Sequence, residues 1–328
     1  MADQLPADIT PARVSRLLTA AEFQKLADVP PEVEWFANIT NPHTRRAYEN
    51  AVKDFMRFTG ILRPEEFRIV TRAHIIKWRD DLRARLNRRG EPWTGASIRH
   101  RLAALASLFE YLCERNAVTH NPVKGVERPK TESGAGKTPA LGDHQARQLL
   151  DAPQADTIKS KRDRAILSTL LFHALRREEL CKLKVKDARH ARKGVPHLRV
   201  SGKGGKTRYL PLHPGTQALL HDYLDAVGHG TDEHGALFRP IRNNTTGKLD
   251  QAITPDGIYK LVRAYAREHG FEIGAHALRA TAATNALDHE ADIAKVQEWL
   301  GHANISTTRI YDHRRTRPED SPTFKVAY

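Results

Sequence analysis

The sequence predicts a mainly α-helical protein with a small antiparallel β-sheet, and three observations support this fold class. A length of 328 residues is enough for about two domains of roughly 100 to 200 residues each. Apolar residues recur at helical spacing in several segments between 41 and 112 and between 141 and 311. The stretch HLRVSGKGGKTRYLPL at 197–212 has two short β runs around a glycine-rich turn, which predicts one hairpin.

Residues 31–125 are predicted to form an all-helical domain. An Asn-Pro pair beginning at Asn41 can cap and start a helix whose apolar positions continue as far as Gly60. Two similar amphipathic segments follow, one capped by Thr71 and one opened by Ser97. Together these segments predict a helical bundle.

The rest of the chain divides by composition. Residues 1–30 are expected to be an N-terminal arm, and 126–139 are a linker because prolines, glycines and charges occur there without apolar periodicity. A second domain is predicted over 140–313, with a central buried helix at 164–175 that is apolar nearly all round. The tail 314–328 ends in TFKVAY, which alternates like a strand and would join a sheet edge of its own or a neighbouring subunit.

The chain is strongly basic, and the excess charge is spread over both domains. There are 53 Lys and Arg against 39 Asp and Glu, a formal net charge of +14. The part up to residue 130 carries +6 and the remainder +8. An extended polyanion that touches both domains explains this distribution better than a small acidic ligand does.

The cysteine content and the apolar runs exclude several protein classes. Cys113 and Cys181 are far apart and outside any CxxC pair, so neither a disulfide framework nor a cysteine zinc site is supported. No apolar run approaches the roughly 18 residues of a membrane span, and the start of the chain lacks the pattern of a signal peptide. We therefore expect a cytoplasmic, nucleoid-associated protein without a membrane partner.

Two segments resemble a nucleotide-binding and a metal-binding motif, but neither has the required residues at the required spacing. Gly205-Lys206-Thr207 ends like a P-loop, but Val200 stands where the earlier glycine is required, and the context is β-turn-β instead of strand-to-helix. His289-Glu290 would need a second histidine where Ile293 stands to form the zinc-binding helix motif. The sequence therefore predicts no cofactor and no metal.

Seven polar residues of the second domain are candidate site residues, although each taken singly has an ordinary structural explanation. His276 and Arg279 are three residues apart, so on a helix both would project toward a common target. A tyrosine near a C-terminus is usually a packed or half-exposed ring. In chain order the set is Arg176, Glu179, Lys203, His276, Arg279, His302 and Tyr311.

In this order the residues resemble the tyrosine site-specific recombinases, the phage-integrase-like family. The matching strings are ALRREEL around Arg176, GKGGKTRYLPL around Lys203, HALRATAATNAL from His276, and LGHANISTTRIYDH, which includes Tyr311. One such string alone is weak, whereas four in the family's order are highly specific. The strong resemblance covers about residues 140–312.

The resemblance implies an N-terminal helical core-binding domain of SAM-like fold, which matches more weakly, followed by an α+β tyrosine recombinase catalytic domain. The chain departs from the family pattern at two positions. Ala174 stands where members commonly have glycine, and Ala280 stands where many have histidine. Neither position supplies a core catalytic group, so the departures bear on the subfamily.

The resemblance also implies how a DNA phosphodiester is broken without water. Such a reaction needs a side-chain nucleophile, neutralisation of charge on the phosphoryl oxygens, and a proton for the departing 5′ oxygen. Tyr311 would be the nucleophile and would form a 3′-phosphotyrosyl intermediate. Lys203, carried on the hairpin, would be the general acid.

The remaining candidates would support these two groups. Arg176 and Arg279 would clamp the non-bridging oxygens with planar guanidinium forks. His302 would donate a further hydrogen bond to the same oxygens, and His276 would accept or relay the tyrosine proton. Glu179 would orient Arg176.

The partners implied by the resemblance are double-stranded DNA at two recombination sites and further copies of the chain, assembled as a tetramer that passes through a Holliday junction. No nucleotide is needed, because one phosphodiester bond is exchanged for another. Four arginines of the first domain are expected to contact phosphates or groove edges: Arg45, Arg46, Arg99 and Arg101.

Two alternative functions remain open at this point. A type IB topoisomerase-like enzyme would nick and reseal DNA with similar chemistry but would yield no recombinant product from two duplexes. A DNA-binding regulator that kept the fold and lost the reaction would form no covalent adduct with DNA.

Overall fold

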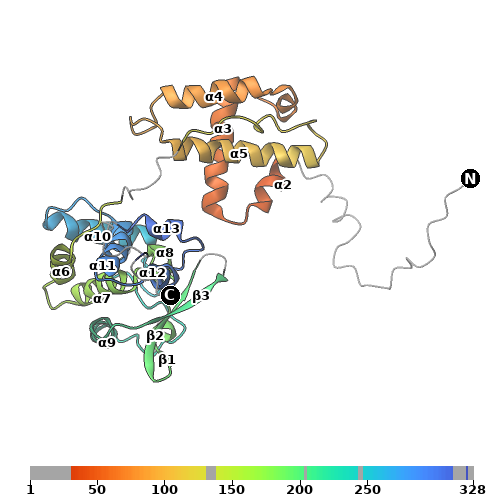
Figure 1. Cartoon of the computed structure of the whole chain (residues 1–328). Coiled ribbons are helices and arrows are strands. Elements are labelled where there is room, and N and C mark those ends of the chain that lie inside the picture. Colours follow the sequence, from red (N-terminus) through yellow and green to blue (C-terminus); the bar gives the residue numbers. More distant parts are fainter. Residues whose placement is uncertain (1–30, 131–137, 203–204, 243–246, 313–322, 324–328) are drawn as a thin grey trace, which may run out of the picture. The chain divides into compact units, whose positions relative to one another are not determined.

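The computed structural model describes residues 31–130, 138–202, 205–242, 247–312 and 323. The chain divides into two compact units, Met1–Ser133 and Gly134–Tyr328 (Figure 1). Four expectations therefore lie wholly or partly outside the described residues: the arm at 1–30, the linker over 131–137, the position of Lys203, and the strand TFKVAY apart from Thr323.

Unit 1 is helical, as the apolar periodicity predicts. Its elements are α2 (Pro31–Asn38), α3 (Pro42–Thr59), the 3-10 helix η1 (Pro64–Ile69), α4 (Arg72–Ala84) and α5 (Gly95–Glu114).

The ends of α3 are those expected from the sequence. The Asn41 side chain accepts hydrogen bonds from the backbone N–H groups of His43 and Thr44, at 2.9 and 3.2 Å. Gly60 follows the helix with a φ of +78°, a left-handed conformation that costs glycine little. Local capping chemistry therefore sets both ends of this helix.

The start of α5 corrects one expectation. The helix begins at Gly95, and its cap is Thr94, so Ser97 lies inside the first turn. The backbone N–H of Ser97 donates to Thr94 Oγ1 at 3.2 Å. A threonine and a serine three residues apart can both fill this role, and the apolar pattern alone does not separate them.

The core of unit 1 is aromatic and aliphatic. Phe55 of α3, Trp78 of α4 and Phe109 of α5 are all fully buried. The rings of Phe55 and Trp78 meet edge-on, with centroids 5.3 Å apart. Burial of each such side chain stabilises the fold by about 1.5–3 kcal/mol, which holds the three helices together.

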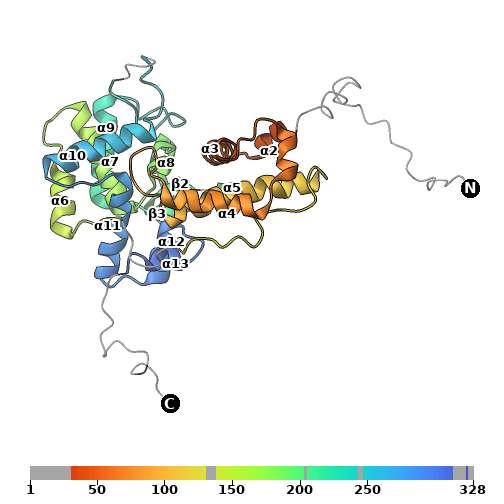
Figure 2. The ribbon, with the colours of Figure 1, turned by 90° about the horizontal axis from the view of Figure 1, so that it is seen from above.

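Unit 2 combines helices with one small sheet. Its helices are α6 (Asp143–Asp151), α7 (Ile158–His173), α8 (Arg177–Cys181), η2 (Val185–Ala188), α9 (Pro214–Val227), α10 (Pro255–Glu268), α11 (Ala275–Asp288), α12 (Ile293–Leu300) and α13 (Ser306–Arg309). Helix α7 packs between α9 and α11 in its core (Figure 2). Among the described residues, no helix is long and apolar enough to cross a membrane.

The sheet has the antiparallel order β1-β2-β3, from β1 (His190–Arg192), β2 (Val195–Ser201) and β3 (Thr207–Pro211). The β2–β3 hairpin is the one that the sequence predicts, and Ser201 pairs with Thr207 at its closed end. The short edge strand β1 was not foreseen, because three residues carry too little alternation to detect.

Helix α7 ends earlier than the apolar run suggests. It stops at His173, and Ala174 follows with a φ of +49° in the left-handed region. This conformation explains why glycine is the more usual residue at that position, since a Cβ is strained there. The turn directs the chain out of α7 and places Arg176 just ahead of α8.

Candidate active site

Two segments of unit 2 converge on the carboxylate of Glu179 in α8, which is buried. Glu179 Oε1 accepts hydrogen bonds from Arg176 Nη1 at 2.9 Å and from Arg208 Nη1 at 3.0 Å. Glu179 Oε2 accepts from Arg208 Nη2 at 2.8 Å and from the backbone N–H of Arg176 at 2.9 Å. One carboxylate therefore holds two guanidinium groups.

The electrostatics of this cluster leave a positive charge at the surface. Burial opposes the ionisation of Glu179, but the hydrogen bonds from Arg208 and Arg176 outweigh it and lower its pKa to about 2. The Arg208 side chain is 16% exposed, whereas that of Arg176 is 41% exposed. Arg176 is therefore the member of the cluster that an anion can reach.

Arg279 lies on α11 and is only 1% exposed. Its Nη1 donates to the backbone oxygen of Ala174 and its Nη2 to that of Leu300. Nη2 also contacts His302 Nε2 at 3.0 Å. Burial and, to a smaller extent, the positive charge of Arg176 together lower the pKa of Arg279 to about 10, so the group remains charged at neutral pH.

The contacts of His302 determine which ring nitrogen carries the proton. Arginine can only donate, so Nε2 must accept from Arg279, and the proton resides on Nδ1, which faces Thr308 Oγ1 at 2.9 Å. Burial and, to a smaller extent, the positive charge of Arg279 together lower the pKa of His302 to about 4. In this arrangement Nε2 has no hydrogen to donate, which differs from the expected role toward phosphate.

Tyr311 lies in the turn after α13, which ends at Arg309. The ring is 5% exposed and stacks on the His302 ring, with centroids 6.2 Å apart and an interplanar angle of 25°. The backbone N–H of Tyr311 donates to Thr308 O at 3.0 Å. The structure thus brings Tyr311, His302 and Arg279 together.

His276, at the start of α11, lines a hollow of about 570 Å³ together with Arg176 and Arg177. Burial lowers the pKa of His276, and the charges of Arg279 and Arg176 lower it further. A neutral imidazole at this place can accept a proton. Lys203 lies outside the described residues, but Gly202 beside it lies at the closed end of the β2–β3 hairpin, where its N–H donates to Lys206 O at 2.7 Å.

Arg208 is the site residue that the sequence analysis missed. Strand alternation offers a signal, because Arg208 shares the inner face of β3 with the buried Leu210. An arginine on the core side of a strand needs a buried acceptor. Glu179 is that acceptor, 29 residues earlier in the chain.

The four arginines predicted to touch DNA differ in their surroundings. Arg45 is exposed and donates to the backbone oxygen of Ile39, and Arg46 is exposed. Arg99 donates to Pro129 O at 3.3 Å. The Arg101 side chain is 17% exposed, pairs with Asp54 at 3.2 Å and stacks over the Trp93 ring.

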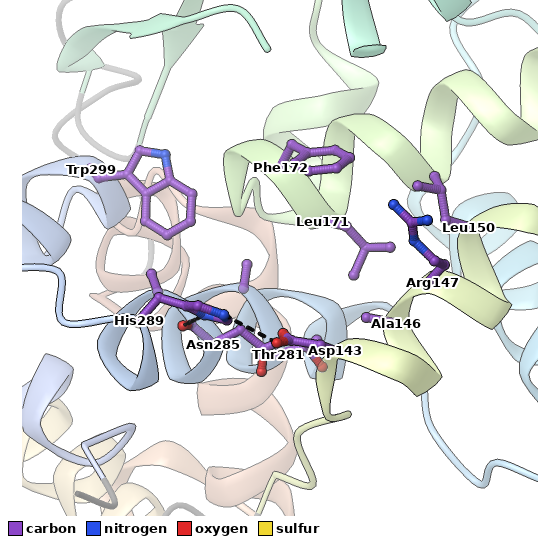
Figure 3. Close-up of a pocket in the computed structure, with 12 residues that line it drawn as sticks. Asp143, Ala146, Arg147, Leu150, Leu171, Phe172, Thr281, Asn285, His289 and Trp299 are labelled. Carbon is purple, nitrogen blue, oxygen red and sulfur yellow. Dashed lines mark hydrogen bonds and ion pairs between the residues drawn. The ribbon is translucent and has the colours of Figure 1, made fainter. Parts of the chain in front are cut away.

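A separate hollow of about 380 Å³ lies between α6, α7, α11 and α12 (Figure 3). Trp299, Phe172 and Leu171 give it an apolar wall. At its rim His289 Nε2 is 3.2 Å from a carboxylate oxygen of Asp143. The described site residues from Arg176 to Tyr311 do not line it.

Both units are similar to known proteins. The phage integrase family matches residues 140–317, and the phage integrase N-terminal SAM-like domain matches residues 38–116. The tyrosine recombinase XerD of Listeria monocytogenes serotype 4b (strain F2365) is 32% identical over 276 residues, which are 83% of this chain and 88% of the relative. The tyrosine recombinase XerC of Pelobacter propionicus is 33% identical over 276 residues, 83% of this chain and 85% of the relative.

Solved structures share the same mainly helical fold. A lambda integrase tetramer bound to a Holliday junction has a TM-score of 0.63 and 16% identity, over 89% of this chain and 80% of that chain. The XerH site-specific recombinase bound to palindromic difH substrate has a TM-score of 0.63 and 22% identity, over 82% of this chain and 76% of that chain. Family match, sequence relatives and fold agree, and the chain belongs to the phage integrase family of tyrosine recombinases.

Proposed function

We propose that the chain is a site-specific DNA recombinase that cleaves and rejoins strands through a 3′-phosphotyrosyl intermediate. One observation carries the proposal: the Tyr311 ring stacks on His302, whose Nε2 is hydrogen-bonded to Arg279. The candidate nucleophile Tyr311 and the candidate phosphate ligand Arg279 therefore lie close together, although they are 32 residues apart in the chain. The basic charge of both halves of the chain fits a DNA substrate.

The proposed cleavage step exchanges one ester for another. The phenol oxygen of Tyr311 attacks the phosphorus, and the bond from phosphorus to the 5′ oxygen breaks. The phenol proton passes to His276, whose lowered pKa keeps the ring neutral and able to accept it. Lys203 gives a proton to the departing 5′ oxygen. Rejoining is the reverse attack by a 5′ hydroxyl, so the reaction needs no energy source.

The phosphate would be bound by groups that change partners when DNA enters. Arg176 already has an exposed guanidinium, and Arg279 can exchange His302 Nε2 for a phosphate oxygen as acceptor. The negative phosphate then raises the pKa of His302 from about 4, which favours a proton on Nε2. His302 would thereby become the hydrogen-bond donor that the sequence analysis expects.

We further propose that four copies act on two duplexes and pass through a Holliday junction. The lambda integrase structure with a similar fold is a tetramer on such a junction, and the XerH structure contains its difH substrate. The C-terminal segment TFKVAY would join a neighbouring copy. In unit 1 the exposed Arg45 and Arg46 fit phosphate contacts best, whereas Arg101 is committed to Asp54.

A nicked duplex that traps the covalent adduct tests this proposal. The unmodified chain and a Tyr209→Phe control, which changes an exposed tyrosine on β3, should both form a covalent protein–DNA adduct. Tyr311→Phe should form none while it binds the duplex with nearly unchanged affinity. Binding without any adduct would support the inactive regulator instead.

A second assay separates recombination from nicking and resealing. Two labelled duplexes that carry the chain's own site should yield a recombinant product. Relaxation of supercoiled DNA with no recombinant product would favour a topoisomerase-like activity. The site can be found by trapping the adduct on random DNA and sequencing the attached strands.

A further inference from the structure

Arg208 of β3 touches three segments of the candidate active site. Its guanidinium fork binds both oxygens of Glu179, at 3.0 and 2.8 Å. It lies against Gly301, the residue before His302, where an added Cβ would be 3.3 Å from Arg208 Nη1. It also lies beside Gly202 at the closed end of the hairpin, where an added Cβ would be 3.5 Å from the same nitrogen.

Arg208 affects the net charge and the position of the Arg176 guanidinium. Arg176 makes a single side-chain hydrogen bond to Glu179, from Nη1 to Oε1, and Oε2 already accepts from Arg208 Nη2 and from the backbone N–H of Arg176. With two arginines and one carboxylate, the cluster has a net charge of +1. Without Arg208 the buried carboxylate would draw Arg176 into a bidentate pair of zero net charge. The guanidinium that faces solvent would then be turned inward and neutralised.

We propose that Arg208 is a positioning residue for strand cleavage: it holds the Glu179 carboxylate so that Arg176 stays free for the scissile phosphate. This inference rests on the proposed function. Arg208 itself is 16% exposed and does not need to touch DNA in this role.

A double-mutant cycle tests the proposal through single-turnover adduct formation on the nicked duplex. Arg208→Gln should slow cleavage by on the order of 100-fold, as small displacements of catalytic groups do. Adding Glu179→Gln to Arg208→Gln should recover at least about tenfold of that loss, because a neutral amide no longer sequesters Arg176. A merely structural arginine would change the unfolding midpoint of the single and double variants but leave the cleavage rate of the folded, duplex-bound chain near wild type.

The matched control is Arg199→Gln on the neighbouring strand β2, where Arg199 Nε pairs with Asp187 at 2.8 Å. It should cleave at the wild-type rate. Thermal unfolding and duplex affinity are measured for every variant, and if Arg208→Gln does not fold, Arg208→Lys with and without Glu179→Gln replaces it. Folded variants that cleave at the wild-type rate, or a double variant no faster than the single one, would overturn the inference. A wild-type chain that forms no adduct would instead overturn the proposed function.

Discussion

Each unit contains a buried carboxylate shared between arginines, and the two clusters use this arrangement differently. In unit 1, Asp54 accepts a hydrogen bond from Trp78 Nε1 at 3.1 Å and pairs with Arg85 and Arg101. In unit 2, Glu179 pairs with Arg176 and Arg208. Both acidic residues are buried, and each carboxylate is neutralised by the arginines around it.

The two clusters differ in how exposed their arginines are and in how many contacts each arginine makes. Arg101 is 17% exposed. Its charge is paired with Asp54, and its guanidinium lies over the Trp93 ring at 4.1 Å from the centroid. Arg176 is 41% exposed and makes one side-chain contact with Glu179. A shared carboxylate can therefore either complete a core or hold a guanidinium toward solvent, depending on how much of the arginine side chain stays exposed.

Alanine substitutions at Arg176 and at Arg101 should give the largest difference between the two clusters. Arg176→Ala should lower the single-turnover cleavage rate by about 10²–10³-fold, the usual loss for one preorganised donor, with little change in unfolding free energy. Arg101→Ala should destabilise unit 1 and leave the cleavage of bound duplex close to the wild-type rate. Equal cleavage defects in the two folded variants would contradict the division of roles.

Acid should weaken unit 2 through His173, the last residue of α7 before the turn to Arg176. His173 is 1% exposed, its Nε2 accepts from the His213 N–H at 3.1 Å, and burial lowers its pKa to about 4. The unfolded state, with a pKa near 6.5, binds more protons between these values. Stability is therefore full above pH 6.5 and should fall by up to about 3 kcal/mol as pH drops to 4.

Urea unfolding at a series of pH values measures this effect. His173→Gln keeps an acceptor for the His213 N–H but does not titrate, so it should reduce the slope between pH 6.5 and 4. The slope that remains includes the contribution of His302, whose pKa is lowered to about 4 as well. An unchanged slope in that variant would assign the acid sensitivity to other groups.

Removal of the central charge of unit 1 tests the structural side of the comparison. Asp54→Asn removes the anion between Arg85 and Arg101 and should lower the unfolding free energy by about 2 kcal/mol. The loss is smaller than for a fully buried pair, because Arg85 is partly exposed and keeps its pairing with Asp81 at 2.7 Å. Asp151→Asn, at an exposed helix end, is the control that should stay near wild type. Similar unfolding midpoints for the two variants would show that Asp54 is dispensable.

The smallest expected effect is at Ala174. Its φ of +49° is strained for a residue with a Cβ, so Ala174→Gly should stabilise unit 2 by about 1 kcal/mol. Thermal unfolding would detect this as a raised midpoint. A lowered midpoint would mean that the methyl packing of this buried residue outweighs the backbone strain.

Local patterns predict much of the fold. The cap at Asn41, the stop at Gly60 and the hairpin at 197–212 all appear as expected, because each depends on side chains within a few residues of one another. The end of the buried helix does not, since the apolar run continues past His173 while the backbone turns at Ala174. Apolar content is set by burial and does not distinguish a helix from the buried turn that follows it.

The sequence by itself determined the candidate site residues, through four strings in one order, and the helical character of unit 1. Only the tertiary structure decided that Arg208 shares Glu179, that Arg101 serves Asp54 and that His302 accepts from Arg279. These contacts join residues 29, 47 and 23 positions apart, and each depends on an approach of about 3 Å. Periodicity specifies which face of an element a residue occupies, but the partner it meets there depends on how the elements pack.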